Sequence, residues 1–432
     1  MSETTVSIRH LKAHADQVVH LKGWLSNKRR SGKIGFLQVR DGSGTVQCVA
    51  SRGELSEEAW EDVKAVTQES TVHVSGTVRV DDRAPGGVEL HVTDFGVDDL
   101  CGEFPITPKE HGTAFLMQHR HLWLRSSRQR AALAVRNEVC QGIRDFFYER
   151  DFTLIDSPIL TPAACEGTST LFETDYFGDP AFLSQSGQLY LEPAISAFGK
   201  VYCFGPTFRA EKSKTRRHLM EFWMVEPEVA FLEFDGVCDL AEDFVQSLVG
   251  RVLERCQEPL KVLERDTSKL EKSTAAFPRV TYTEAVELLR RKGQSLQWGE
   301  DFGGEDETVL AEHFDQPVLV THFPAEIKAF YMEPDPDDPR LALGVDVIAP
   351  EGYGEIIGGS QRIHDHDLLL KRIQDHDLPL EAFQWYLDVR KYGTCPHSGF
   401  GMGIERFVAW MTGVKHLRET IPYPRMLYKI YP

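Results

Sequence analysis

The sequence predicts an α+β protein of two domains, a small N-terminal β-barrel followed by a larger domain in which strands and helices mix. Five short strands are expected in the first hundred residues, a stretch with prolines and a glycine follows, and later residues alternate amphipathic helices with apolar strands. A chain of 432 residues is too long for one ordinary domain, and 41% hydrophobic residues suffices for sizeable cores. We therefore expect domains at 1–100 and 126–432, joined by a connector at 101–125.

The first domain is expected to place one helix between its third and fourth strands. Ser56 is a good helix cap, and Ala59, Trp60 and Val63 share one face of the helix that follows it. This order of elements is that of an oligonucleotide-binding (OB-fold) barrel, which binds single-stranded bases on its face. The expected strands are Val18–Leu25, Ile34–Asp41, Thr45–Ala50, Thr71–Val80 and Val88–Asp94.

Three residues of this barrel are suited to contact RNA. Phe36 could stack on a base, Arg29 could contact the backbone, and Gln47 could hydrogen-bond a base edge. Packing of Phe36 in the barrel core is an equal alternative on the pattern alone.

Composition excludes several classes of protein. No apolar run approaches the roughly 20 residues of a membrane span, and the N-terminus MSETTVSIRH lacks an apolar signal region, so we expect a cytoplasmic protein with no membrane partner. The 8 cysteines include no CxxC pair, which argues against a zinc site or a disulfide scaffold. The net charge of −18 opposes nucleic-acid binding, but basic residues concentrate at 9–40 and 204–228, and local patches decide phosphate contacts.

The segment Phe204–Glu228, FGPTFRAEKSKTRRHLMEFWMVEPE, is the first dense group of polar residues in the larger domain. Apolar runs on both sides of a basic loop predict strand, loop, strand. Alternation along a strand puts Arg209 and Glu211 on one face, so a cation for phosphate and an acceptor for an amine would point into one cleft. A solvated hairpin tip is the alternative.

Two further segments suggest a nucleotide and a metal. In LALGVDVIAPEGYGEIIGGSQR, a hairpin would bring Asp346 and Glu355 together, which suits Mg²⁺ shared with ATP phosphates. In GFGMGIER, a glycine-rich strand leads to Arg406 at a predicted helix start, where phosphate binds well. The sequence has no GxxxxGK[ST] loop and no complete Rossmann fingerprint, so other ATP-binding folds lack motif support.

These segments resemble the motifs of class II aminoacyl-tRNA synthetases, in order and over nearly the whole chain. FTLIDSPIL, after a predicted helix at 127–149, is similar to the first motif, FRAEKSKTRRHLMEFW to the second and GFGMGIER to the third. GWLSNKRRSGKIGFLQVRDGSGTVQCV resembles the anticodon-binding barrel of the aspartyl/asparaginyl/lysyl subclass. The resemblance implies an antiparallel-sheet catalytic domain, a homodimer formed through the first motif, and tRNA as a partner.

The resemblance also implies roles for individual residues. Catalysis falls to Arg209, Glu355 and Arg406, and the metal to Glu355 and Asp346. The anticodon-reading positions match Arg29, Phe36 and Gln47. ATP contacts are implied for Arg209, Glu211, Arg217, His218, Leu219, Phe222, Glu355, Gly403, Ile404, Glu405 and Arg406. Amino-acid contacts are implied for Glu166, Ser186, Gln188, Leu191, Arg209, Glu226 and Arg362.

Two positions predict which amino acid is bound. Leu191 stands where aspartyl enzymes have a lysine that grips the substrate carboxylate, and Glu226 stands where they have an aspartate. Asparagine and aspartate are nearly isosteric, so charge must separate them, and a glutamate accepts from an amide but repels a carboxylate. We therefore expect activation of L-asparagine, with Glu226 and Arg362 converging on its side-chain amide. A peripheral salt bridge is the alternative for Glu226.

Three other functions remain open. An aspartyl-tRNA synthetase, including one that also charges the asparagine tRNA, would share every motif. An asparagine synthetase on the same catalytic domain would lack the barrel. A non-catalytic RNA-binding paralogue would be expected to lose Arg209, Glu355 or Arg406.

Two smaller features allow more than one interpretation. His322, at the end of an expected strand, could cover the substrate or lie on the surface. The repeated DHDL, at 365–368 and 375–378, could form a metal cluster, but polar helix ends in a helical hairpin are the better interpretation.

Overall fold

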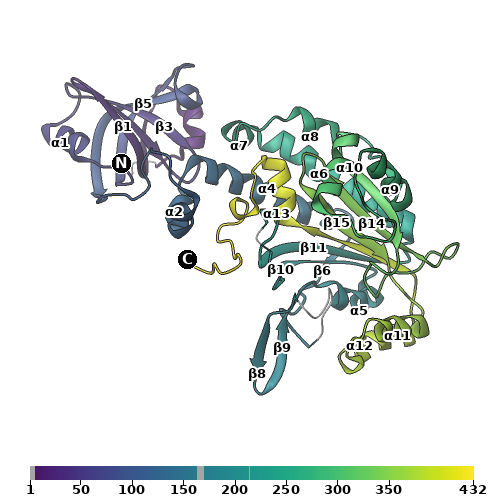
Figure 1. Ribbon diagram of the computed structural model, residues 1–432. Helices are drawn as coiled ribbons and strands as arrows, with labels where there is room; N and C mark the ends of the chain where they lie inside the picture. The colour runs from purple at the N-terminus through teal and green to yellow at the C-terminus, as the bar shows by residue number, and fades with distance from the viewer. Residues whose placement is uncertain (1–4, 163–169, 214) are drawn as a thin grey trace. The chain divides into compact units, whose positions relative to one another are not determined.

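The computed structural model describes residues 5–162, 170–213 and 215–432. The chain divides into two compact units, Met1–Gly112 and Thr113–Pro432, each with its own hydrophobic core (Figure 1). The stretch at 101–125, expected as a connector, contains two short helices in its second half: α2 (Thr113–Gln118) and α3 (Arg120–Trp123).

The first unit is a closed barrel with the strand order β1-β2-β3-β5-β4, as the sequence predicts. A helix lies between β3 and β4, and the side chain of Ser56 caps it by accepting from the backbone N of Ala59 at 3.1 Å. The elements are η1 (Ile8–His14), β1 (Val18–Ser31), β2 (Ile34–Arg40), β3 (Thr45–Ser51), α1 (Glu57–Ala65), β4 (Thr71–Val80), η2 (Pro85–Gly87) and β5 (Val88–Asp99).

Alternation along β2 decides how Phe36 is placed. Leu37 and Val39 are fully buried in the barrel core, whereas Phe36 is half-buried on the outer face. Phe36 pairs with Arg29 across β1 and β2, and the guanidinium of Arg29 lies 5.0 Å from the centroid of the Phe36 ring. Packing of Phe36 in the core, the alternative raised by the sequence, is therefore wrong.

The second unit is built on an eight-stranded sheet with the order β12-β13-β14-β15-β16-β11-β10-β6. The sheet is antiparallel except at its edges, where β12 pairs parallel with β13 and β6 pairs parallel with β10. Its strands are β6 (Thr153–Leu154), β10 (Lys200–Phe208), β11 (Glu221–Ala230), β12 (Arg279–Thr281), β13 (Val318–Pro324), β14 (Leu341–Ala349), β15 (Gly354–Gln361) and β16 (His397–Gly403).

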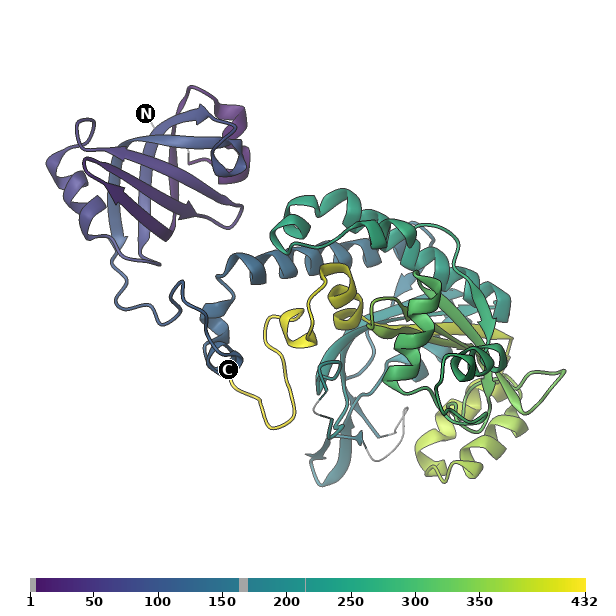
Figure 2. The ribbon, with the colours of Figure 1, turned by 45° about the horizontal axis from the view of Figure 1, so that its top comes forward.

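Helices α4 (Ser127–Tyr148), α6 (Phe234–Arg255) and α13 (Ile404–Thr412) pack together against one face of this sheet (Figures 1 and 2). The predicted helix at 127–149 corresponds to α4. A small sheet with the order β7-β9-β8 extends away from the large sheet in both views. The remaining elements are β7 (Leu160–Thr161), β8 (Glu173–Tyr176), β9 (Asp179–Leu183), α5 (Gln188–Phe198), α7 (Gln257–Val262), α8 (Ser268–Lys272), α9 (Tyr282–Arg291), α10 (Gly304–Phe314), α11 (His366–Asp375), α12 (Leu380–Lys391) and η4 (Leu417–Glu419).

The DHDL repeats lie at the two ends of α11, which forms a pair with α12 (Figure 1). The side chain of Asp365 caps α11 by accepting from the backbone N of Leu368 at 2.8 Å. No group of three or more metal-ligating side chains occurs among the described residues. The repeats therefore mark polar helix ends, as expected.

The two faces of the large sheet carry different chemistry. On β11, Val225 and Val229 pack into the core under the helices, so alternation turns Glu226 and Glu228 to the opposite face. On β14, Val345 and Val347 are core residues and Asp346 lies between them. The face away from α4 and α6 thus collects buried carboxylates.

Glycines on β16 make room for these carboxylates. A Cβ at Gly399 would lie 2.2 Å from Oε1 of Glu228 and 2.3 Å from the backbone oxygen of Pro227. A Cβ at Gly401 would lie 2.6 Å from Cε of Met224. The glycine-rich strand therefore serves close packing beside β11 as well as any ligand.

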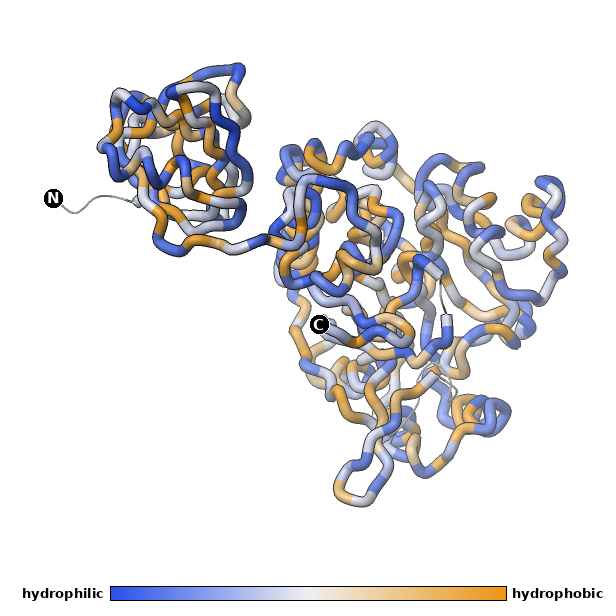
Figure 3. The backbone as a smooth tube through the Cα atoms, turned by 60° about the vertical axis from the view of Figure 1, so that its left-hand side comes forward, coloured by the Kyte–Doolittle hydropathy of each residue, from blue (hydrophilic) through white to orange (hydrophobic). Residues whose placement is uncertain are grey.

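Within the described residues, no helix is long and apolar enough to cross a membrane. Figure 3 shows short hydrophobic stretches broken repeatedly by hydrophilic ones along the chain.

Gly399→Ala is expected to destabilise the second unit by about 1–3 kcal/mol, because the new methyl group meets a backbone oxygen that cannot move aside. Gly250→Ala, in α6 where a Cβ meets nothing within 4 Å, is the matched control and should be neutral or stabilising. Denaturant unfolding of the two variants measures the difference. Equal midpoints would contradict the close packing described for β16.

Candidate active site

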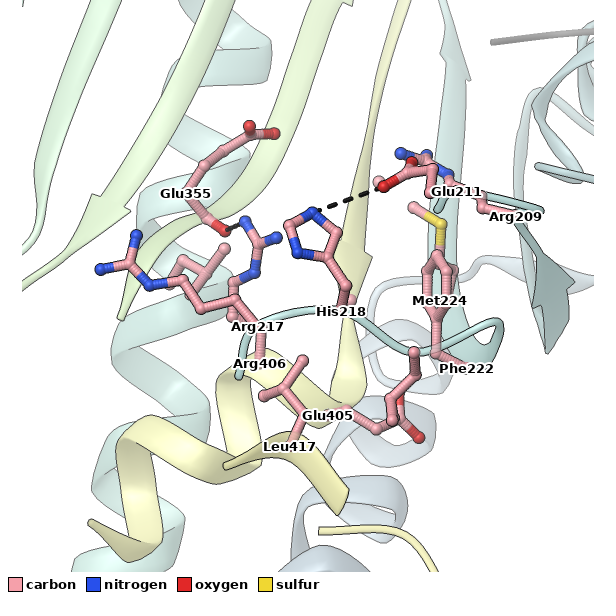
Figure 4. Close-up of a pocket in the computed structure, with 14 residues that line it drawn as sticks. Arg209, Glu211, Arg217, His218, Phe222, Met224, Glu355, Glu405, Arg406 and Leu417 are labelled. Carbon is pink, nitrogen blue, oxygen red and sulfur yellow. Dashed lines mark hydrogen bonds and ion pairs between the residues drawn. The ribbon is translucent and has the colours of Figure 1, made fainter. Parts of the chain in front are cut away.

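A cavity of about 140 Å³ opens on the carboxylate-bearing face of the sheet (Figure 4). It brings together the second and third motif segments, which are almost 200 residues apart in the sequence. Every residue expected to contact ATP lines it except Ile404, which is fully buried in the hydrophobic core. The lining residues are Arg209, Glu211, Arg217, His218, Leu219, Phe222, Met224, Glu355, Ile356, Gly401, Gly403, Glu405, Arg406 and Leu417.

One side of the cavity gathers positive charge. Figure 4 shows Arg217, His218 and Arg406 close together beside Glu355, and Nη1 of Arg406 donates to the backbone oxygen of Glu355. Burial lowers the pKa of His218, and the neighbouring arginines lower it further although Glu211 opposes them. His218 is therefore neutral at physiological pH, and the guanidinium groups supply the charge for a phosphate.

Arg217 is held in place by contacts with α10 and the β14–β15 turn. Its Nη1 lies 3.1 Å from Oε2 of Glu307, and its Nη2 donates to Oγ1 of Thr308 at 3.1 Å and to the backbone oxygen of Gly352. These contacts orient one guanidinium group toward the cavity, so the cation is pre-positioned for an anionic ligand.

The other side of the cavity combines an aromatic ring with a second arginine. The guanidinium of Arg209 lies 5.6 Å from the ring centroid of Phe222, and Glu211 contacts His218 at 3.4 Å between Oε2 and Nε2 (Figure 4). A planar heterocycle and a phosphate can therefore bind a few ångströms apart on this wall.

Glu405 lines the cavity, but its carboxylate serves the framework. Its Oε1 lies 2.7 Å from Nη1 of Arg136 on α4, and its Oε2 accepts from the backbone N of Trp223 on β11 at 2.9 Å. Glu405 thereby fixes the start of α13, and with it the position of Arg406.

The hairpin of β14 and β15 brings Asp346 and Glu355 together as the sequence predicts. A Cβ on Gly358 would lie 2.9 Å from Oε1 of Glu355 and 3.8 Å from Oδ1 of Asp346. However, Oδ2 of Asp346 is 2.6 Å from Nζ of Lys328, a partner that the sequence analysis did not identify. Burial raises the pKa of Asp346 to about 7; Lys328 opposes this rise, and Glu355 adds to it.

Glu226 lies with two of the expected amino-acid-binding residues. Its carboxylate accepts from Oγ of Ser186 and, at 2.8 Å, from the backbone N of Gly187. The backbone N of Gln188, the first residue of α5, donates to the same serine oxygen at 3.1 Å. Glu226 is only 3% exposed, so the alternative of a peripheral salt bridge is wrong.

Arg362, expected to converge with Glu226 on the substrate amide, is held by Glu228, a partner that the sequence did not indicate. Its Nε lies 3.1 Å from Oε1 of Glu228 and its Nη1 donates to Oγ of Ser360 at 2.8 Å. Glu228 is two residues beyond Glu226 on the same face of β11, so Arg362 contacts the next carboxylate along the strand. Burial lowers the pKa of Arg362, but the adjacent Glu228 outweighs burial and the net direction is upward.

Of three other expected residues, the two that the structure describes do not line the ATP cavity. Leu191 is fully buried and packs with Ile195 and Val201, so its side chain belongs to an apolar cluster. Glu166 lies outside the described residues. His322 is half-buried at 3.7 Å from Oδ2 of Asp335, in a different cavity.

A buried polar network behind the amino-acid pocket was missed by the sequence analysis. Oε1 of Glu192 accepts from Nε2 of Gln188 at 3.1 Å and from the hydroxyl of Tyr386 at 2.7 Å. Oε2 of Glu192 contacts Arg390 and, at 3.0 Å, Nε2 of His397. Burial alone would raise the pKa of Glu192, but these cationic partners lower it overall. Tyr386, Arg390 and His397 are 194 to 205 residues from Glu192 in the sequence, so no local pattern could identify them.

The barrel places its three candidate RNA-binding residues on adjacent strands. Arg29 lies on β1, Phe36 on β2 and Gln47 on β3. Gln47 is half-buried, and its Nε2 lies 3.3 Å from Oε2 of Glu89 on β5. The barrel therefore presents a cation, an aromatic ring and an amide on neighbouring strands.

Comparisons with known proteins agree with this geometry. A family described as tRNA synthetases class II (D, K and N) matches residues 113–427, and an OB-fold nucleic acid binding domain matches residues 19–97. The asparagine–tRNA ligase of Desulforamulus reducens is 59% identical over 98% of this chain and 99% of that protein. The asparagine–tRNA ligase of Sorangium cellulosum is 57% identical over 100% of this chain and 99% of that protein.

A solved structure is similar over its whole length. The asparaginyl-tRNA synthetase of Pyrococcus horikoshii, complexed with asparaginyl-adenylate, has a TM-score of 0.96 and 42% identity, with 100% of both chains covered.

Proposed function

The chain belongs to the class II tRNA synthetases of the D, K and N family, and we propose that it activates L-asparagine with ATP and transfers it to the asparagine tRNA. The observation that carries the choice of amino acid is the buried carboxylate of Glu226, close to the cavity and without the lysine that position 191 would supply in an aspartyl enzyme. An amide can donate to this carboxylate, whereas a second carboxylate would be repelled.

The proposed reaction has two steps. A carboxylate oxygen of asparagine attacks the α-phosphorus of ATP, the bond to the oxygen that bridges to the β-phosphate breaks, and pyrophosphate leaves. Arg209 stabilises the charge that develops at the α-phosphate, while Arg217 and Arg406 hold the leaving group. A hydroxyl of the terminal tRNA ribose then attacks the carbonyl carbon of the adenylate, and AMP leaves. Positioning and charge neutralisation supply the acceleration, so no strong general base is required.

We propose that Mg²⁺ accompanies ATP at Glu355. This cation commonly binds through one or two carboxylates together with substrate phosphates. The protein therefore does not need to supply three metal ligands of its own. When bound, it would neutralise charge on the phosphates. Asp346 is close enough to contribute, but its carboxylate is already paired with Lys328.

Four further properties are proposed with the function. Leu154 on the edge strand β6, Leu160 on β7 and the adjacent Ile159 are 44%, 42% and 47% exposed, which supports a homodimer formed through the first motif. The barrel, as an anticodon-binding domain, would bind tRNA through Arg29, Phe36 and Gln47. The domain division at 1–100, 101–125 and 126–432 and a cytoplasmic location also remain proposals.

ATP–pyrophosphate exchange without tRNA tests the choice of amino acid. We expect kcat/KM for asparagine to exceed that for aspartate by about 10²-fold or more, because only the amide can donate to Glu226. Exchange stimulated by aspartate alone would instead identify an aspartyl-tRNA synthetase, and exchange with neither would favour a non-catalytic paralogue.

Glu226→Gln is expected to lower kcat/KM for asparagine by about 10–100-fold, because a neutral amide is a weaker acceptor than a carboxylate. The variant also no longer repels aspartate, so the ratio of asparagine to aspartate activity should fall. The KM for ATP should change by less than about twofold. Glu221→Gln, on the same strand, is the control. An unchanged ratio of asparagine to aspartate activity would show that Glu226 does not contact the side chain of the substrate.

Phe36→Ala is expected to raise the KM for tRNA about tenfold, because one base loses its stacking partner. Exchange without tRNA should remain at the wild-type rate. Val49→Ala, at the paired position on β3, removes apolar area from the same outer face and serves as the control. Equal aminoacylation kinetics for both variants would contradict a stacking role.

A further inference from the structure

A second cavity, of about 240 Å³, adjoins the proposed ATP cavity. The two share the side chains of Arg217, Arg406 and Leu417, so the arginines expected to hold the outer phosphates also face this second chamber. Its lining residues are Arg216, Arg217, Arg265, Glu351, Gly352, Tyr353, Arg406, Ala409, Gly413, Val414, Lys415 and Leu417.

The chamber is strongly cationic. Five of its described lining residues carry positive charge, and Glu351 is the sole acid among them. That carboxylate is already neutralised, because Arg265 binds it with both terminal nitrogens, at 2.9 Å and 2.6 Å. Arg217 is paired with Glu307, which lies outside the chamber wall, and no described carboxylate forms an ion pair with Arg216, Arg406 or Lys415.

Two of these cations are available to a ligand. Arg216 and Lys415 are exposed, and neither side chain forms an ion pair with any other described residue. Both lie outside the wall of the ATP cavity. They could bind an anion in the second chamber without releasing a structural contact.

The surrounding titratable groups respond to the same positive field. Burial lowers the pKa of Arg217; Glu307 opposes this, and Arg406 and Arg216 lower it further. Burial, Arg418 and Arg216 together lower the pKa of His416 to about 4. An anion in the chamber would relieve this crowding of like charge.

We propose that the second chamber binds the pyrophosphate released by the first step of the proposed reaction. Arg217 and Arg406 hold the leaving group at one end of the ATP cavity, and the same two side chains form the wall of the chamber. Pyrophosphate can therefore pass from one set of contacts to the next toward Arg216 and Lys415 without losing its cationic partners. This inference rests on the proposed function and adds a product site to it.

The size of the chamber favours a small inorganic anion over a nucleic acid. It adjoins the cavity in which the anion is formed and has a volume of only about 240 Å³, whereas a tRNA backbone would need a long groove that presents several cations in a row. The adenylate has lost two phosphates and stays beside Arg209. Product and intermediate would thus occupy different ends of the site.

The test uses the double variant Arg216→Gln/Lys415→Gln and the matched variant Lys292→Gln, which removes an exposed charge at the end of α9. We expect the double variant to raise the KM for pyrophosphate in asparagine-dependent exchange about tenfold. The KM values for ATP and asparagine should change by less than about twofold, because neither residue lines the ATP cavity. Lys292→Gln should have the wild-type KM values for pyrophosphate, ATP and asparagine.

Each outcome has a separate meaning. An unchanged KM for pyrophosphate, with normal asparagine-dependent exchange in the wild type, would overturn the inference and leave the proposed function intact. A parallel rise in the KM for ATP would overturn it too, because the chamber would then be part of the substrate phosphate site. A rise in the KM for tRNA alone would show that Arg216 and Lys415 bind tRNA instead of pyrophosphate, which would also overturn the inference. Absence of exchange by the wild type would contradict the proposed function itself.

Discussion

The active site depends on keeping several carboxylates buried around the large sheet. A buried acid without a partner would take up a proton or destabilise the fold, so each needs a cation or several donors. The chain meets this need with partners from distant segments, which tie the strands and helices around the site together. The described pairs are Glu228 with Arg362, Glu405 with Arg136, Glu192 with Arg390, and Asp346 with Lys328. Gly399 on β16 supplies the space that Glu228 needs.

Local patterns predict much of the fold and part of the site. Alternation identified the barrel strands, and the long amphipathic stretch identified α4. Arg209, Glu211, Arg217 and His218 were correctly expected at one cavity because they flank a single strand–loop–strand unit. Partners could not be predicted in the same way. Lys328 is 18 residues from Asp346, and Arg362 is 134 residues from Glu228, so only the register of the assembled sheet shows which carboxylate each contacts.

The unforeseen partner of Arg362 shows how fine this register is. Glu226 and Glu228 are two residues apart, which is one period of a β-strand, so both carboxylates face the same side of the sheet. The sequence alone therefore does not show which of them contacts Arg362. Helix α5 was missed for a related reason, because Gly187 and Pro193 obscure its periodicity. Its first residue, Gln188, nevertheless lies beside Ser186 and Glu226 as expected. Residue type was informative where the backbone pattern was not.

Under the proposed binding of Mg²⁺ at Glu355, the ion pair of Lys328 with Asp346 would affect how the free protein binds divalent metals. The ammonium group is a tethered counter-ion, which already occupies one of the two carboxylates on the β14–β15 hairpin. Glu355 alone is a weak ligand for a hard dication that prefers several oxygens. Uptake of metal by the resting enzyme would then be low, and the ion would enter mainly as part of a metal–nucleotide complex. Metal dependence would follow nucleotide concentration more closely than free metal.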